Sequence, residues 1–327
     1  MNKYKDKNVL RKQLVFLSFL FIVFLASATM IYLGATVFRS HLPFFQLLDS
    51  EKTTDVILEP KPVVNPGVYD VEPQSSINLY MVLGSDFRPQ SGFRTDTLIL
   101  VALDKKSGKA SMVSFPRDLW VTIPGFGEGR INTAMQFGGF QSLASTLQTN
   151  FGVYPTQYAM IDMEGFLKII DTLGGVEFYT DLYTGDACDG SLDPDRWCEV
   201  GPGQVSMNSD LALWYVRARY NSSDFDRMRR TQEVVKAVFD QIKTPGGMLK
   251  VPQLMKIYES EVESNIPTDS LLPLVQLGLD FDSDEDIRRY VIGPNEVTSW
   301  TTWEGAAVLL PNVPAIQTIL QEALTFE

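Results

Sequence analysis

The feature that most constrains this chain is an uncharged run of 25 residues near its N-terminus, Leu14–Phe38. As an α-helix it would be roughly 37 Å long, enough to cross a hydrocarbon core of about 30 Å with some tilt. Five basic residues and one acidic residue precede it. Because basic residues stay on the cytoplasmic side, the pattern predicts a cytoplasmic tail (1–13), one membrane helix (14–38) and an extracytoplasmic remainder.

A cleaved signal peptide is the alternative, and Ala26-Ser27-Ala28 resembles a cleavage site. The apolar core of a signal peptide is usually about 7–15 residues long, so the length of this run favours an uncleaved anchor. Both interpretations place the bulk of the chain outside the membrane.

The two cysteines fit an oxidising compartment. Cys188 and Cys198 flank a polar, turn-rich stretch, and they are the only cysteines in the chain. An even number of cysteines outside the membrane predicts a disulfide that closes this short loop, with two free thiols as the alternative.

Composition excludes several classes of protein. The net charge of −12 disfavours nucleic acid as a partner. The only histidine, His41, lies beside the membrane segment and away from every motif. Serine–histidine or cysteine–histidine catalysis and histidine-rich zinc sites are therefore excluded. Any chemistry must depend on carboxylates and arginines.

The extracytoplasmic part is predicted to have three regions. Residues 39–76 form a proline-containing stalk, 77–245 a domain of alternating strands and helices, and 246–327 an accessory layer without an assigned function. The domain is expected to contain strands at 77–83, 97–103, 110–115 and 157–162, and helices at 140–150, 165–173 and 224–242. The five tryptophans are assigned to packing rather than to sugar binding: Trp120, Trp197, Trp214, Trp300 and Trp303.

Charged residues gather in three loops at strand ends: Asp86 and Arg88, Arg94 and Asp96, and Arg117. If the first two strands pair antiparallel, Asp86 and Asp96 lie at one edge of the sheet. Two carboxylates beside a phosphate can hold Mg²⁺, or Mn²⁺ in its place. The alternative is that these aspartates are ordinary turn residues.

A second arginine cluster surrounds the start of the helix at 224–242. Asp224 is expected to be its N-cap, and Arg227 and Arg230 share a face. Cations there oppose the helix dipole, so the cluster favours an anion site that Arg217 and Arg219 would join if their segment is extended. The alternative is a solvated basic surface balanced by neighbouring acids. Arg130 is either a further phosphate contact or a surface residue.

The chain resembles the LytR–CpsA–Psr family in seven ordered motifs: VLGSDFR, RTDTLILV, SFPRD, RINTAMQFGG, DTLGGV, ALWYVRAR and DFDRMRRTQ. The resemblance implies an α/β fold, a three-layer α-β-α sandwich with a central mixed sheet. It also implies transfer of a glycopolymer, such as teichoic acid or capsule, from a polyprenyl-pyrophosphate carrier to peptidoglycan. The polyprenyl tail would lie in an apolar tunnel between the sheet and the helices.

The resemblance also implies roles for single residues. Asp86 and Asp96 match magnesium-associated aspartates, and Arg130 replaces a family lysine. The usual arginine–glutamine–glutamine run reads Arg230-Thr231-Gln232 in this chain. The positions that match pyrophosphate-binding residues are Arg94, Arg117, Arg217, Arg219, Arg227 and Gln232.

The expected reaction is attack of a peptidoglycan hydroxyl on the sugar-linked phosphorus, with arginines and Mg²⁺ neutralising the pyrophosphate. Asp96 or Asp224 would accept the hydroxyl proton, and the sequence does not choose between them. Two alternatives remain open. One is a pyrophosphatase that uses water as the acceptor, and the other is a membrane-bound carrier-binding or regulatory protein without turnover.

Overall fold

The structure is a computed structural model that describes residues 68, 70, 71, 73, 76–88, 92–220, 222–271, 274 and 285–326. The predicted cytoplasmic tail, the membrane helix and most of the stalk lie outside these residues, so their assignments stay predictions. Among the described residues, no helix combines the length and the apolar character needed to span a bilayer.

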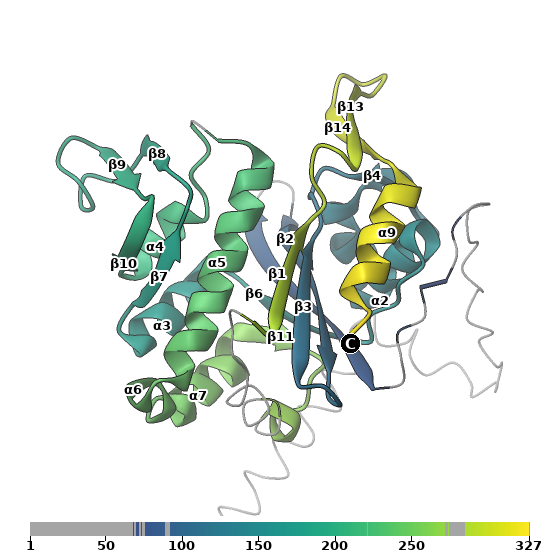
Figure 1. Ribbon diagram of the computed structural model, residues 1–327. Coiled ribbons are helices and arrows are strands. Elements are labelled where there is room, and N and C mark those ends of the chain that lie inside the picture. Colours follow the sequence, from purple (N-terminus) through teal and green to yellow (C-terminus); the bar gives the residue numbers. More distant parts are fainter. Residues whose placement is uncertain are drawn as a thin grey trace, which may run out of the picture. The chain divides into compact units, whose positions relative to one another are not determined.

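A six-stranded mixed sheet forms the centre of the domain (Figure 1). Strand β1 pairs antiparallel with β2 and parallel with β6, and β3 pairs antiparallel with β2 and parallel with β12. This mixed α/β arrangement confirms the sequence-based expectation. The antiparallel pairing of β1 with β2 meets the condition under which Asp86 and Asp96 were expected at one edge of the sheet. The strand order is β11 (Val262–Ser264), β6 (Gln157–Ile161), β1 (Ile77–Arg88), β2 (Gly92–Asp104), β3 (Lys109–Ser114) and β12 (Ile287–Val291).

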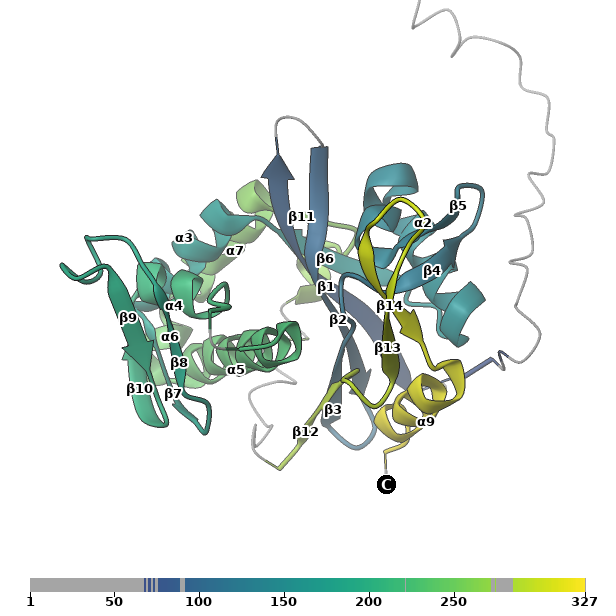
Figure 2. The same ribbon diagram turned by 90° about the horizontal axis from the view of Figure 1, so that it is seen from above.

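Helices lie on both faces of this sheet (Figures 1 and 2). On one side are α2 (Ala134–Phe151) and α9 (Val313–Ala323), and on the other are α3 (Met163–Leu173) and α5 (Asp224–Lys243). The two inner strands β1 and β2 are apolar over residues 79–83 and 98–103, where both of their faces are covered. Along β1, Met81 and Leu83 join the core beneath α2, whereas Tyr80 and Val82 face α5.

Four two-stranded sheets surround the central one: β4 (Trp120–Ile123) with β5 (Gly127–Arg130), β7 (Val176–Thr180) with β10 (Gly203–Met207), β8 (Thr184–Ala187) with β9 (Trp197–Val200), and β13 (Val297–Thr301) with β14 (Ala307–Pro311). Further helices within the described residues are η2 (Ile131–Thr133), α4 (Ser209–Tyr215), α6 (Pro245–Met248) and α7 (Val251–Glu261). A disulfide between Cys188 and Cys198 closes the β8–β9 hairpin.

The first turn of α5 differs from the sequence-based expectation by one residue. Its N-cap is Ser223, whose hydroxyl accepts from the Asp226 N–H, while the Asp226 carboxylate accepts from the Ser223 N–H. This reciprocal capping box satisfies the backbone N–H groups of Ser223 and Asp226. Asp224, expected to be the cap, is instead the first residue of the helix, and its carboxylate is left to contact arginines.

Residues beyond 246 are built into the same domain rather than added beside it. Strand β12 extends the central sheet next to β3. Helix α9 buries Ile316 and Leu320 in the core beneath the sheet. The segment predicted to be an accessory layer therefore supplies both edge strands of the central sheet, β11 and β12, and part of the main core.

Candidate functional site

A cavity of about 290 Å³ lies between the ends of β1 and β2 and the first half of α5. Its polar end carries four arginines and three aspartates, and its deeper part is apolar. The charged lining residues are Asp86, Asp96, Arg117, Asp162, Arg217, Arg219 and Arg227. We call it the arginine cavity. Segments far apart in the sequence meet here.

A β-bulge positions the aspartate at its centre. In the β1–β2 ladder, Gly84 pairs with Thr97 and Ser85 with Thr95, so Asp96 is the extra residue between two successive pairs. A β-bulge leaves the extra residue unpaired in the ladder and changes the direction of its side chain. The Asp96 carbonyl accordingly accepts from both terminal nitrogens of Arg227, at 3.2 Å each.

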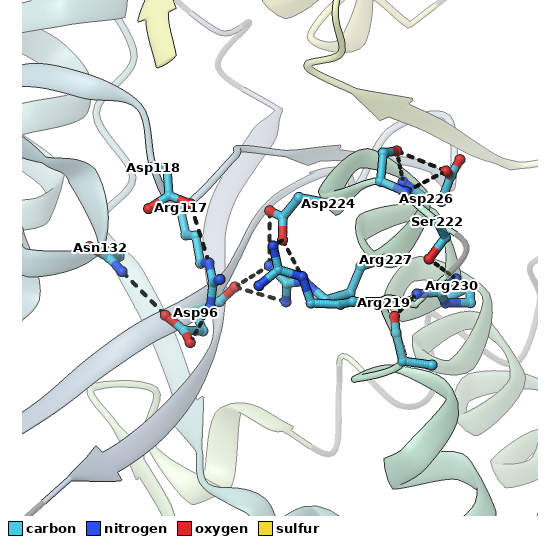
Figure 3. Close-up of polar contacts among 12 residues, drawn as sticks. Asp96, Arg117, Asp118, Asn132, Arg219, Ser222, Asp224, Asp226, Arg227 and Arg230 are labelled. Carbon is cyan, nitrogen blue, oxygen red and sulfur yellow. Dashed lines mark hydrogen bonds and ion pairs between the residues drawn. The ribbon is translucent and has the colours of Figure 1, made fainter. Parts of the chain in front are cut away.

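The carboxylate of Asp96 joins two other segments (Figure 3). One oxygen accepts from Arg117 Nη1 at 2.6 Å, and the other accepts from Asn132 Nδ2 at 3.2 Å. Burial alone would lower the pKa of Arg117, but the charges of Asp96, Asp224 and Asp118 raise it above the usual value. Arg117 is therefore held as a cation against the cavity wall.

Arg227 is the arginine of α5 that faces the arginine cavity, and it is buried. Its Nε donates to Asp224 at 2.9 Å, in addition to its contacts with the Asp96 carbonyl. Burial by itself would raise the pKa of Asp224, but the hydrogen bonds and charge of Arg227, together with Arg117 and Arg219, lower it. Asp224 is thus an anion that orients arginines, as Figure 3 shows.

Arg217 and Arg219 form the open rim of the cavity. Both follow α4 in a loop, and both are exposed. Arg219 lies 3.8 Å from Asp224, whereas no ion pair joins Arg217 to another residue in the described part of the chain. An exposed, unpaired guanidinium beside three others suits an anion with several oxygen atoms, such as a phosphate.

Several residues predicted to contact phosphate lie elsewhere. Arg130 pairs with Asp118 at 3.1 Å and donates to the Ala307 carbonyl. Gln232 is buried and donates to Ser114 and to the Tyr290 carbonyl. Neither side chain lines the arginine cavity.

Arg230 is also buried away from the cavity. Its terminal nitrogens donate to the Ala218 carbonyl and to Ser222 and Thr184. It therefore holds the loop that carries Arg217 and Arg219, as the right side of Figure 3 shows.

Arg94 and Arg88 lie near the open end of the β1–β2 ribbon. Arg94 is directly opposite Asp86 in the ladder, so both side chains leave the sheet on the same face. The Arg94 Nε is buried without a hydrogen-bond partner among the described residues. The side chain of Arg88 lies outside the described part.

Two site residues are not predicted as such by the sequence. Asp162 lines the cavity while its carboxylate caps α3 through the Gly165 N–H. Asn132 orients Asp96 from η2. Asp162 carries the sequence signature of a helix cap only, and Asn132 carries no signal beyond its place in the RINTAMQFGG stretch.

The donor set suits a hard divalent cation only in part. Asp86 and Asp96 line one cavity, and Mg²⁺ is commonly held by one or two carboxylates plus substrate phosphates and water. In the part of the chain that the structure describes, no three His, Cys, Asp or Glu residues gather to hold a metal ion by themselves. The residues present therefore fit a metal that arrives with a phosphate ligand.

A second, apolar cavity of about 270 Å³ lies deeper between the sheet and α5. Its walls come from one face of the sheet, where Tyr80, Val101 and Met112 are neighbours across three strands. Val82 and Val235 line both this cavity and the arginine cavity. An apolar chain attached to a phosphate would meet apolar walls beyond the arginines.

Known proteins resemble this chain in sequence over more than half of its length. Regulatory protein MsrR of Staphylococcus aureus (strain COL) is 30% identical over 217 residues, which are 65% of this chain and 63% of that protein. The teichoic acid transferase TagU of Bacillus subtilis (strain 168), named polyisoprenyl-teichoic acid–peptidoglycan teichoic acid transferase, is 28% identical over 194 residues, 58% of this chain and 60% of that protein. The matched region thus spans less than two thirds of each relative.

Solved structures share the fold. Crystalline TagV of B. subtilis has a TM-score of 0.63 at 24% identity, covering 77% of this chain and 98% of that one. TagT bound to LIIa-WTA has a TM-score of 0.61 at 20% identity, covering 79% and 92%. The profile of the LytR_cpsA_psr family matches residues 48–322, including the strand, helix and loop segments that build the arginine cavity. This chain belongs to the LytR_cpsA_psr family.

Proposed function

We propose that this protein is a membrane-anchored phosphotransferase that moves a glycopolymer from a polyprenyl-pyrophosphate carrier to peptidoglycan. The observation that carries the proposal is that the arginine cavity and the apolar cavity adjoin, with Val82 and Val235 in the walls of both. A ligand with a pyrophosphate at one end and a long hydrocarbon at the other matches this sequence of environments. The names of the relative TagU and of the TagT complex support the same class of substrate.

The arginines bind and orient the pyrophosphate in this proposal. Arg217 and Arg219 meet it at the rim, and Arg117 and Arg227 meet it at the wall. Their charges stabilise the negative charge that develops on the leaving polyprenyl phosphate. The acceptor hydroxyl forms a new bond to the sugar-linked phosphorus while the bond from that phosphorus to the bridging oxygen breaks.

Asp86 and Asp96 are the residues that would hold Mg²⁺ or Mn²⁺, together with the phosphates. When bound, such an ion supplies charge neutralisation and polarises the phosphoryl oxygens. We propose Asp96 rather than Asp224 as acceptor of the hydroxyl proton, because Asp96 lines the cavity and Asp224 does not.

The location proposed for this activity is the outer face of the cell membrane, with the predicted helix at 14–38 as the anchor. A chain that handles a lipid-linked donor gains from being held at the bilayer, since the donor is confined to the same surface.

The test uses the full chain in lipid nanodiscs with Mg²⁺, a synthetic polyprenyl-pyrophosphate glycan and peptidoglycan oligomers. Wild type is compared with Arg117→Ala and with Arg117→Lys, which keeps the charge. We expect peptidoglycan-linked glycan from wild type, little from the alanine variant, and loss of product when EDTA removes the divalent ion.

Other products would identify other functions. Free sugar phosphate without a peptidoglycan-linked product would establish a pyrophosphatase. Carrier lipid that is bound but stays intact, across several glycans, would establish a carrier-binding or regulatory protein, as the name of the relative MsrR suggests for that protein.

A further inference from the structure

Three aromatic side chains stand exposed on and beside the β8–β9 hairpin: Tyr183, Trp197 and Tyr220, with 50%, 36% and 75% of their surface accessible. The rings of Trp197 and Tyr220 meet edge to face at 5.0 Å. Tyr183 and Trp197 close over Gly185, where a Cβ would lie 3.2 Å from the tyrosine hydroxyl and 3.5 Å from the indole. We call these three residues the aromatic shelf.

A single carboxylate is set among these rings. Trp197 Nε1 donates to Glu199 Oε1 at 3.0 Å. The Tyr183 hydroxyl also hydrogen-bonds to Glu199, which raises the pKa of that tyrosine. Ring faces that accept the C–H face of a sugar, next to a carboxylate that accepts its hydroxyls, make an amphipathic surface of the kind that saccharides need.

The shelf is tied to the arginine cavity by short covalent and hydrogen-bonded links. Tyr220 directly follows Arg219, which lines the cavity. Asp186 of β8 accepts from the backbone N–H of Tyr220 at 3.0 Å and from that of Arg219. The disulfide between Cys188 and Cys198 braces the same hairpin, next to Trp197.

A hollow beside the same hairpin adjoins the arginine cavity. It lies between the hairpin and the end of α4, and it shares Leu213 and Arg217 with the arginine cavity. In Figure 1 the β8–β9 hairpin and the first turn of α5 lie at the same end of the domain. Because Tyr220 directly follows Arg219, a ligand on the shelf would lie near the rim of the arginine cavity.

The charge of the hairpin selects among saccharides. Residues 184–200 contain five carboxylates and one arginine, Arg196. A polymer rich in phosphate would be repelled by this surface, whereas an uncharged sugar chain would not. The donor polymer and the acceptor thus differ in how well the shelf suits them.

We infer that the aromatic shelf binds the uncharged N-acetylated glycan strand of the peptidoglycan acceptor and presents its hydroxyl to the arginine cavity. This inference rests on the proposed function for the identity of the acceptor. The binding itself is independent of turnover. From sequence alone Trp197 is assigned to packing, because exposure at a hairpin edge has no local signature.

Binding is tested first with the full chain in nanodiscs and a probe, the hexamer of β-1,4-linked N-acetylglucosamine. Saturation-transfer NMR reports on the complex for wild type and for every variant. Burying about 50 Å² of one ring face predicts about a tenfold effect. We therefore expect Tyr220→Ser and Trp197→Ala each to weaken binding about tenfold at unchanged thermal stability.

Two exposed aromatics provide matched controls outside the shelf. Tyr179→Ser and Trp303→Ala remove side chains that are 64% and 98% accessible, and neither should alter hexamer binding. Equal affinity of wild type and both shelf variants would overturn the inference, as would equal losses in the controls. This binding experiment gives a result even if no transferase activity is found.

Steady-state transfer assays then distinguish an effect on acceptor binding from an effect on donor binding. Tyr220→Ser should raise the KM for peptidoglycan oligomers about tenfold and leave the KM for the lipid donor unchanged. A raised donor KM with an unchanged acceptor KM would show that the shelf holds donor sugars, and the acceptor assignment would then be wrong.

Discussion

Replacing Arg217 with alanine should separate ligand binding from folding. Arg217 is exposed at the rim of the arginine cavity and has no ion pair with another described residue, so its removal leaves no buried partner behind. Substitutions of this kind usually change the free energy of unfolding by no more than about 0.5 kcal/mol. For a domain of this size, that corresponds to a shift in Tm of about 1–2 °C.

The effect on the donor should be much larger. A hydrogen bond to a charged group contributes about 1.5–3 kcal/mol, and solvent at the rim favours the lower part of that range. A loss of about 1.5–2 kcal/mol weakens binding about 10- to 30-fold. The expected result is thus a large change in Kd with almost no change in Tm.

The assay measures the Kd of the full chain in nanodiscs for a non-cleavable methylene-diphosphonate analogue of the donor, alongside thermal unfolding. Arg229→Ala is the matched control. That side chain is 55% exposed and 3.4 Å from Asp226, and it does not line the cavity. If Arg217→Ala and Arg229→Ala bind the analogue equally well, the assignment of Arg217 to the phosphate site is refuted.

Three further variants test other parts of the structure. Arg230→Ala should lower the free energy of unfolding by about 2–4 kcal/mol in urea titrations. The substitution removes a buried, hydrogen-bonded cation and leaves the Ala218 carbonyl unsatisfied. A loss under about 1 kcal/mol would contradict the structural role of Arg230. Val235→Phe should fill the space where the arginine cavity and the apolar cavity adjoin. A donor analogue with a long polyprenyl chain should then lose far more affinity than one with a two-isoprene chain. Equal losses of affinity would argue against this route for the lipid. Asp104→Asn should flatten the acid limb of the stability profile between about pH 4 and pH 2. The Ser107 hydroxyl above all, with the N–H groups of Lys106 and Ser107, lowers the pKa of Asp104 to about 2. Its stabilisation is fully present above the unfolded pKa of about 3.9 and is lost as the pH falls through about 2. Identical slopes for variant and wild type would contradict that role of Asp104.

Local pattern in the sequence was sufficient for the elements that frame the site. Apolar, β-branched runs at 77–83 and 97–103 predicted the inner parts of β1 and β2. The loops expected at Asp86 and at Arg94 are instead strand, because β1 continues to Arg88 and β2 begins at Gly92. The two runs are neighbours along the chain, so their antiparallel pairing follows from a short connection. The same pairing places Asp86 and Asp96 at one edge of the sheet from the amino-acid sequence alone.

Tertiary contacts decided the direction in which individual side chains point. Arg227 and Arg230 are three residues apart and were expected to act together, yet one faces the arginine cavity and the other is buried against the Ala218 carbonyl. Their different roles depend on which distant segment lies over each, and helical spacing alone does not specify that. The helix dipole does not by itself explain the arginine cluster. The capping box and the Asp224 carboxylate already balance the positive end of the dipole in the first turn of α5.

What the sequence by itself determined was therefore the kind of chemistry: arginines and carboxylates at strand ends, no usable histidine, and an apolar segment long enough for a membrane. What only the tertiary structure decided was the bulge at Asp96, the inclusion of β12 in the central sheet, and the aromatic shelf beside Arg219. Each of these depends on a register or a contact between separate segments of the chain. Periodicity and capping act within a few residues, so they carry no information about which distant partner a strand or a ring will meet.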